Sequence, residues 1–214
     1  MFVSDQHRFL FIHVQKTGGV TVERRLQQLM PEGRTARDTD VQRHSRLSTV
    51  LGRYPELTPY FIFGVVRNPW SRMVSWWRMV ERTRERAANG DPWAVARLHG
   101  PDPHPFWSAL DRTCPDFRTF VHEGTEDWTR LSRPQVDFLV TDGRFPDFVG
   151  RQESLEADLR AVAARYDLPW TPLPPPENAD PNPPPSYREY YDDATRERVG
   201  EVFAKDVAYF GYDF

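Results

Sequence analysis

The chain has 214 residues, of which 39% are hydrophobic and 28% are charged, and its net charge is −3. This composition is too apolar and too aromatic for a disordered chain, so we expect one packed domain over residues 1–214. No apolar run approaches the ~20 residues of a transmembrane helix, and we expect neither a membrane segment nor a signal peptide. The single cysteine, Cys114, excludes an internal disulfide framework and a cysteine-rich zinc site, which fits a cytoplasmic protein. The net charge argues against general nucleic-acid binding and leaves room for a local basic pocket.

Two apolar runs, at residues 8–14 and 60–66, predict strands that are buried on both faces of a parallel sheet. Each run is followed by a turn and then by a segment whose apolar residues have helical spacing. The elements predicted for this part of the chain are a strand at 8–14, a helix at 20–30, a charged loop at 34–46, a short helix at 47–51, a strand at 60–66 and a helix at 70–86.

The remaining chain predicts more helices than strands. In chain order we expect a short helix at 116–123, strands at 136–140 and 145–149, a helix at 154–166, a proline-rich loop at 168–186 and a final helix at 192–209. The repeated strand–loop–helix pattern predicts an α/β fold with three layers, in which helices flank a central parallel sheet.

The first motif with chemical content is Lys16-Thr17-Gly18-Gly19, between the first strand and the first helix. Backbone N–H groups at a helix start, two glycines, the Lys16 charge and the Thr17 and Thr21 hydroxyls suit a phosphate-like anion. The alternative is an ordinary glycine turn with a solvent-facing lysine. The motif differs from the G-x-x-x-x-G-K-[ST] loop of nucleoside triphosphatases, because here the lysine precedes the glycines, and no acidic residue follows the second strand to hold a metal.

The second motif runs from Arg67-Asn68-Pro69 to Ser75. Arg67 stands at the carboxyl end of the second strand, which is the ligand side of an open α/β sheet. Ser75 lies in the helix that follows, so an arginine and a hydroxyl could bind one phosphate. The alternative is an arginine at a sheet edge and an ordinary helical serine.

Together the two motifs resemble the signature of the sulfotransferases that use 3′-phosphoadenosine 5′-phosphosulfate (PAPS). In that family a K-T-G-G/S-T type loop binds the 5′-phosphosulfate, and an R-[DN]-P-x-x-R-x-x-S segment binds the 3′-phosphate. The match is to the branch of carbohydrate sulfotransferases and many small bacterial enzymes, and residues 148–155 with Asp158 and residues 190–214 also look like that branch. The chain departs from the pattern at Gln15, where proline is frequent, and at Val20, where a small or hydroxyl residue is common.

The resemblance implies a P-loop-like sulfotransferase fold and transfer of a sulfuryl group from PAPS to a hydroxyl or amine of a small-molecule or carbohydrate acceptor. It implies no metal, and adenosine 3′,5′-bisphosphate (PAP) as the product. The predicted donor-binding residues are Lys16, Thr17, Gly18, Gly19, Val20, Thr21, Arg67, Ser75 and Arg188. Lys16 is also expected to act in the transfer itself, by neutralising charge on the leaving oxygen.

Sulfuryl transfer to a hydroxyl needs a base, and histidine suits that role at neutral pH. The candidates are His7, His13, His44, His99, His104 and His122. His13 lies in the first strand and is expected to be a packed or hydrogen-bonded core residue. His44 stands 23 residues before Arg67, and the resemblance implies a catalytic histidine some twenty residues before that arginine. We therefore predict His44 as the base, against the reading of a solvated loop residue.

The acceptor is expected to contact aromatic side chains between residues 87 and 133, with Arg133 and Gln135 as polar contacts. The arginine- and proline-rich composition fits a bacterial enzyme. Three other classes remain open from the sequence: a Mg²⁺-dependent, kinase-like phosphotransferase, a non-catalytic PAPS- or PAP-binding module, and a helical interaction protein that binds no nucleotide.

Overall fold

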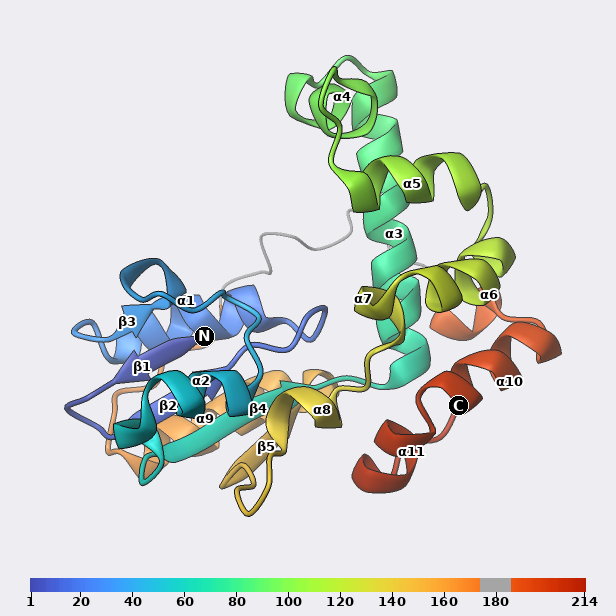
Figure 1. Cartoon of the computed structure of the whole chain (residues 1–214). Coiled ribbons are helices and arrows are strands. Elements are labelled where there is room, and N and C mark those ends of the chain that lie inside the picture. The colour runs from blue at the N-terminus through green and yellow to red at the C-terminus, as the bar shows by residue number, and fades with distance from the viewer. Residues whose placement is uncertain (174–185) are drawn as a thin grey trace. The chain divides into compact units, whose positions relative to one another are not determined.

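The computed structural model describes residues 1–173 and 186–214. These residues form two compact units, one made of residues 1–67 and 135–173 and the other of residues 68–134 and 186–214. The sequence predicts one domain over residues 1–214, and this stays a prediction. Figure 1 shows the helices and strands of both units.

The first unit is built on a five-stranded sheet of order β3-β1-β2-β4-β5. The strands are β1 (Phe2–Ser4), β2 (Phe9–Ile12), β3 (Arg34–Thr35), β4 (Phe61–Val66) and β5 (Phe148–Arg151). The three strands β2, β4 and β5 are parallel, as the apolar runs predicted. β1 is antiparallel to both β2 and β3, so the sheet is mixed at one edge, a feature that the sequence did not predict.

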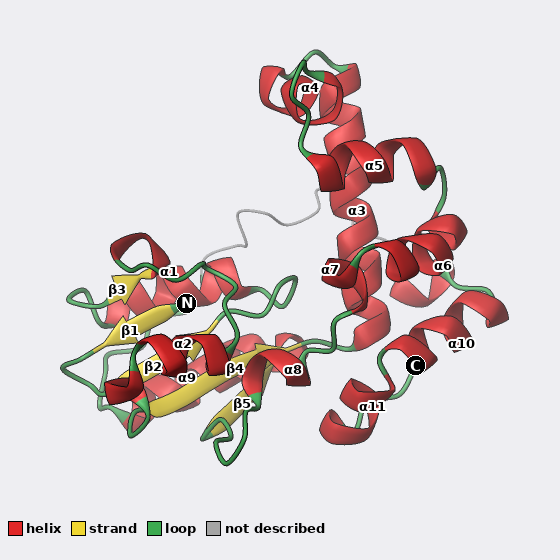
Figure 2. Cartoon of the chain, in the orientation of Figure 1, coloured by secondary structure: helices red, strands yellow, loops and turns green. Residues whose placement is uncertain are grey.

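Helices cover both faces of this sheet, which confirms the three-layer α/β prediction (Figure 2). On one face Phe63 and Val65 pack in a cluster with α1 (Gly19–Leu29) and α9 (Leu155–Arg165). Alternate residues of a strand point to opposite faces, so Gly64 points to the other face. There Leu139 of α8 (Val136–Leu139) fills the space beside Gly64, and α8 contacts α2 (Leu47–Arg53).

The structure corrects three of the predicted elements. Within residues 136–140, Val136–Leu139 form α8 instead of a strand, because so short a segment with three apolar residues fits a buried helical turn as well as a strand. The strand expected at 145–149 is β5, which begins three residues later. The helix expected at 192–209 is divided at Phe203 into α10 (Asp193–Val202) and α11 (Ala204–Phe210). Within the expected loop at 34–46, β3 and a 3-10 turn, η1 (Ala36–Asp38), form, and further 3-10 turns are η2 (Pro55–Leu57) and η3 (Gln152–Ser154).

The second unit is helical and packs around the long helix α3 (Pro69–Ala88). Its other helices are α4 (Pro92–His99), α5 (Pro105–Thr113), α6 (Phe117–Asp127), α7 (Thr129–Ser132), α10, α11 and the 3-10 turn η4 (Tyr187–Tyr190). The inner face of α3 buries Met73, Trp76, Trp77 and Val80, as the spacing predicted. Of the helices described in residues 1–173 and 186–214, none is long and apolar enough to cross a membrane.

The Asn68-Pro69 pair explains why α3 begins where it does. The Asn68 side-chain oxygen accepts hydrogen bonds from the backbone N–H groups of Trp70 (3.0 Å) and Ser71 (3.2 Å). Pro69 occupies the first turn, where its missing N–H costs no hydrogen bond. The second predicted motif is therefore a strand end, a helix cap and a helix start in direct succession.

Candidate active site

The loop between β2 and α1 carries the first predicted motif. Lys16 and Gly18 have left-handed backbones, with φ of 70° and 80°. Glycine adopts this conformation without strain, whereas a lysine there costs about 1–3 kcal/mol. The turn leads into α1, which has no side-chain cap and no acidic residue in its first turn. The start of α1 therefore presents backbone N–H groups and the positive end of the helix dipole, which is the arrangement that favours an anion.

Thr17, Val20 and Thr21, which the sequence also predicts to bind the donor, differ in their burial. Thr17 is fully buried, and its hydroxyl donates to the Val14 carbonyl at 3.0 Å. The Thr17 hydroxyl therefore donates its hydrogen bond within the loop, whereas the sequence predicts that this hydroxyl donates to an anion. Val20 and Thr21 are half-buried in the first turn of α1.

Arg67 follows β4 directly and is half-buried. Since β2 and β4 are parallel neighbours, with Ile12 opposite Gly64, the Lys16 loop and Arg67 leave the same edge of the sheet. Gln135 is fully buried and holds the Arg67 backbone from both sides, accepting from its N–H (2.9 Å) and donating to its carbonyl (2.8 Å). The expectation that Gln135 contacts the acceptor is wrong in this structure, because both ends of its amide bind the chain.

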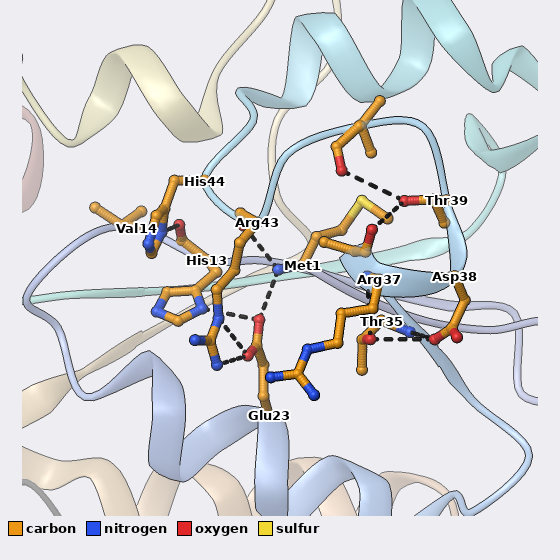
Figure 3. Close-up of polar contacts among 12 residues, drawn as sticks. Met1, His13, Val14, Glu23, Thr35, Arg37, Asp38, Thr39, Arg43 and His44 are labelled. Carbon is orange, nitrogen blue, oxygen red and sulfur yellow. Dashed lines mark hydrogen bonds and ion pairs between the residues drawn. The ribbon is translucent and has the colours of Figure 1, made fainter. Parts of the chain in front are cut away.

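A buried carboxylate network lies beside this loop (Figure 3). Glu23 of α1 is 4% exposed, and its Oε1 lies 2.8 Å from His13 Nδ1 and 2.7 Å from the Met1 amino group. Its other oxygen accepts hydrogen bonds from Arg43, from Nε at 2.8 Å and from Nη2. Burial alone raises the pKa of Glu23, but the hydrogen bonds from His13 and Arg43 outweigh it and hold that pKa well below its usual range. Glu23 is therefore an anion that ties α1 to β2 and to the loop of Arg43.

His13 is a buried, hydrogen-bonded residue, as the sequence predicted. Its ring lies against Gly19, where a Cβ atom would stand 2.1 Å from the His13 Cδ2 and Nε2 atoms. Burial lowers the pKa of His13, and the hydrogen bond to Glu23 opposes that shift. A neutral His13 ring thus fills the space beside the start of α1.

His44 is placed by His13. Its Nδ1 lies 3.0 Å from the His13 carbonyl oxygen, and the two rings meet edge to face with centroids 4.5 Å apart. A carbonyl only accepts hydrogen bonds, so Nδ1 carries the proton and the neutral ring keeps its lone pair on Nε2. Burial first, and then the repulsion that a protonated His13 would exert, lower the pKa of His44 to about 3. His44 is therefore neutral at pH 7, and its Nε2 atom is unprotonated.

Two predicted donor-binding residues belong to the second unit. Ser75 is half-buried on α3, and Arg188 is exposed on η4, with its guanidinium over the rings of Tyr187 (5.1 Å) and Phe214 (5.5 Å). Most of the proline-rich loop, residues 174–185, lies outside the described residues. Within the described ranges there is no group of three or more His, Cys, Asp or Glu side chains that could hold a metal ion.

Glu23 and Arg43 are the functional candidates that the sequence did not reveal. Glu23 lies 10 residues from His13 and 20 from Arg43, and no motif joins them. One signal was present, because Glu23 directly follows the buried Val22 and stands on the apolar side of an amphipathic helix. A carboxylate in such a position is buried only where it is paired.

We expect Gly19→Ala to destabilise the protein by about 1–3 kcal/mol, because the new methyl group would overlap the His13 ring. Urea denaturation measures this change. Gly52→Ala in α2 is the matched control: its Cβ meets nothing within 4 Å, and alanine in a helix interior is favoured over glycine by roughly 0.5–1 kcal/mol. Equal stability of Gly19→Ala and the native chain would contradict the packing of His13 described above.

Comparison with known proteins supports the chemistry suggested by these motifs. A model of the sulfotransferase family matches residues 1–213, which include the Lys16 loop, His44 and the Arg67 segment. No curated protein and no solved structure gives a significant match. The family match spans nearly the whole chain and agrees with the α/β sheet and its flanking helices, and the chain therefore belongs to the sulfotransferase family.

Proposed function

We propose that the protein transfers a sulfuryl group from PAPS to a hydroxyl, or an amine, of a small-molecule or carbohydrate acceptor, with His44 as the general base. Family membership supports sulfuryl transfer in general. The observation that supports His44 as the base is the hydrogen bond from its Nδ1 to the His13 carbonyl. This bond leaves His44 Nε2 as a proton acceptor, and His13 lies three residues before Lys16.

Different residues of the first unit would bind the donor and stabilise the leaving group. PAPS supplies an activated sulfuryl group on a good leaving group, PAP. The loop of Thr17, Gly18 and Gly19, with the first turn of α1 at Val20 and Thr21, would bind the phosphosulfate through backbone N–H groups. Lys16 would neutralise the charge that grows on the bridging oxygen as the S–O bond to phosphate breaks.

His44 would take the acceptor proton on Nε2 while the acceptor oxygen forms its bond to sulfur. A neutral ring is the form that a base requires, and the lowered pKa of His44 keeps it neutral. The negative charge of a bound phosphosulfate favours the imidazolium that forms, so the donor itself would make His44 a stronger base. Arg67 would bind the 3′-phosphate. Ser75 and Arg188 belong to the second unit, and their assignment to the nucleotide stays a prediction from the resemblance.

A thermal-shift comparison tests this proposal at the level of binding. PAP in EDTA is expected to raise the melting temperature, since a ligand at 100 times its Kd adds about 2.7 kcal/mol to stability. Stabilisation by ATP–Mg²⁺ alone would favour a kinase-like phosphotransferase instead. No stabilisation by either nucleotide would favour an interaction protein.

Arg67→Ala is expected to weaken PAP binding by about 1.5–3 kcal/mol, the value of a charge-assisted hydrogen bond, with a smaller effect on turnover at saturating PAPS. The reason is that Arg67 is assigned to a phosphate that does not react. Calorimetric titration with PAP measures the affinity. An unchanged affinity would overturn the 3′-phosphate assignment.

Glu23→Gln is expected to lower turnover by roughly 10²-fold. Glu23 orients His13 and binds Arg43, and Arg43 immediately precedes His44 in the chain. The affinity for PAP should stay within a factor of two to three, the usual scatter of such measurements. Glu32→Gln is the matched control, since Glu32 also accepts from a histidine, His7 Nδ1 at 3.1 Å, and should leave turnover unchanged. Equal turnover of the two variants would show that Glu23 has no role in placing the base.

A further inference from the structure

In the described part of the second unit, two arginines and a histidine gather without a carboxylate partner. This cluster consists of Arg97 on α4, His104 at the N-cap of α5 and Arg130 on α7. The two arginines flank a pair of rings: Arg97 lies over Trp107 (5.4 Å), Arg130 lies over Phe106 (5.0 Å), and the ring centroids are 5.3 Å apart. The backbone N–H of His104 donates to the Arg97 carbonyl at 3.0 Å, which joins the end of α4 to the start of α5.

The lack of an acidic partner among the described residues distinguishes these two arginines from six others of this unit. In the described part of this unit, several arginines pair with carboxylates: Arg78–Glu81, Arg84–Asp111, Arg86–Asp91, Arg118–Asp192, Arg196–Asp193 and Arg198–Glu126. Over the same described residues, the Arg97 and Arg130 guanidinium groups contact aromatic rings and no carboxylate. Burial and then the charge of Arg97 lower the pKa of both Arg130 and His104.

Polar atoms in the cluster also lack hydrogen bonds. Arg97 Nε, His104 Nδ1 and Trp107 Nε1 are buried and have no partner among the described residues. Trp107 itself is 6% exposed. Since a buried donor without a partner costs about 1–3 kcal/mol, this arrangement is stable only where other contacts or a ligand compensate it.

The start of α5 adds a third feature of the same sign. The helix has nine residues, Pro105 lies in its first turn, no side chain caps it and its first turn holds no acidic residue. Its dipole therefore places further positive charge beside His104. One anion would compensate the positive potential of the helix start and of the two arginines, and would relieve the repulsion between the arginines.

We propose that Arg97, Arg130, His104 and the first turn of α5 form a binding site for an oxyanion group, such as a sulfate, a phosphate or a carboxylate. The guanidinium groups would donate two hydrogen bonds each, in the fork geometry that fits such oxygens. This site shares no residue with the predicted donor-binding set, and it does not depend on the proposed reaction.

Titration with sodium sulfate against sodium chloride of equal ionic strength tests this site, followed by the indole N–H resonances of ¹⁵N-labelled protein. Saturating PAP is present, so that a phosphate site in the first unit cannot account for the result. The Trp107 signal, assigned with Trp107→Phe, is expected to shift saturably with sulfate and not with chloride. Phenyl sulfate is the second probe. If it binds more tightly than inorganic sulfate, the oxyanion of the natural ligand is carried on an organic molecule. If it binds equally or more weakly, the natural ligand is a free anion.

Arg97→Gln and Arg130→Gln are each expected to weaken sulfate binding at least tenfold, the lower end of the value of a charge-assisted hydrogen bond. Arg97→Lys keeps the charge without the fork and should fall between Arg97→Gln and the native chain. Arg118→Gln, which removes an exposed arginine paired with Asp192, should bind like the native protein. A Trp107 signal that sulfate and chloride move alike, or equal sulfate affinity in the native chain and both glutamine variants, would overturn the proposal.

Discussion

His44→Ala is expected to lose about 10²–10⁴-fold in turnover and to keep its affinity for PAP, because the proposed role of the ring is to take the acceptor proton and not to bind the nucleotide. His44→Asn tests whether the hydrogen bond to His13 is enough for turnover when proton uptake is lost. Its amide can still donate to the His13 carbonyl, as Nδ1 does at 3.0 Å, but it cannot take a proton, so it should not restore turnover. His7→Ala, in the same unit and paired with Glu32, is the control and should turn over normally.

The pH profile gives a second reading of the same assignment. A base loses activity when it is protonated, so the rate should fall as pH decreases through the pKa of His44. That pKa is lowered to about 3 in the nucleotide-free protein, and a phosphosulfate bound as proposed would shift it upward. The acidic limb should therefore lie between about 3 and the unperturbed histidine value of ~6.5, and His44→Ala should abolish it. Near-normal turnover in His44→Ala would refute the assignment and direct attention to His13 or His104.

Lys16→Ala is expected to lower turnover by about 10²–10³-fold and also to weaken PAPS binding, because the proposed role of its charge is to contact the phosphosulfate both before and during transfer. This joint effect distinguishes Lys16 from His44, whose loss should spare binding. Lys16 and Lys205 are the chain's lysines, so Lys205→Ala is a close control for loss of an amine and should leave both quantities unchanged. A Lys16→Ala variant with native turnover would remove Lys16 from the reaction.

The parts of the site that follow from local sequence were predictable. The apolar runs at residues 8–14 and 60–66 gave adjacent parallel strands, so the Lys16 loop and Arg67 leave the same edge of the sheet. The glycines marked the start of α1, and the Asn68-Pro69 pair marked the start of α3. In each case a few neighbouring residues determine the backbone geometry through turn and capping preferences.

The parts that depend on contacts between distant residues were not predictable. Glu23 meets Arg43 twenty residues later, and nothing in either segment specifies that pairing. The composition of residues 136–140 fits a strand and a helical turn alike, and Leu139 of the helix that forms packs beside Gly64, more than seventy residues earlier in the chain. The assignment of Gln135 failed for the same reason, since its partner is the backbone of Arg67.

Transfer of radiolabelled sulfur from PAPS to a panel of hydroxyl and amine acceptors, in EDTA, tests the central claim most directly. The native protein is expected to form a labelled product and release PAP, and His44→Ala, at PAPS concentrations that saturate it equally, is expected to form about 10²–10⁴-fold less. Tight binding of PAPS without any labelled product across the panel would contradict the proposed reaction and indicate a PAPS-binding module. Equal product from the native protein and His44→Ala would contradict the proposed base.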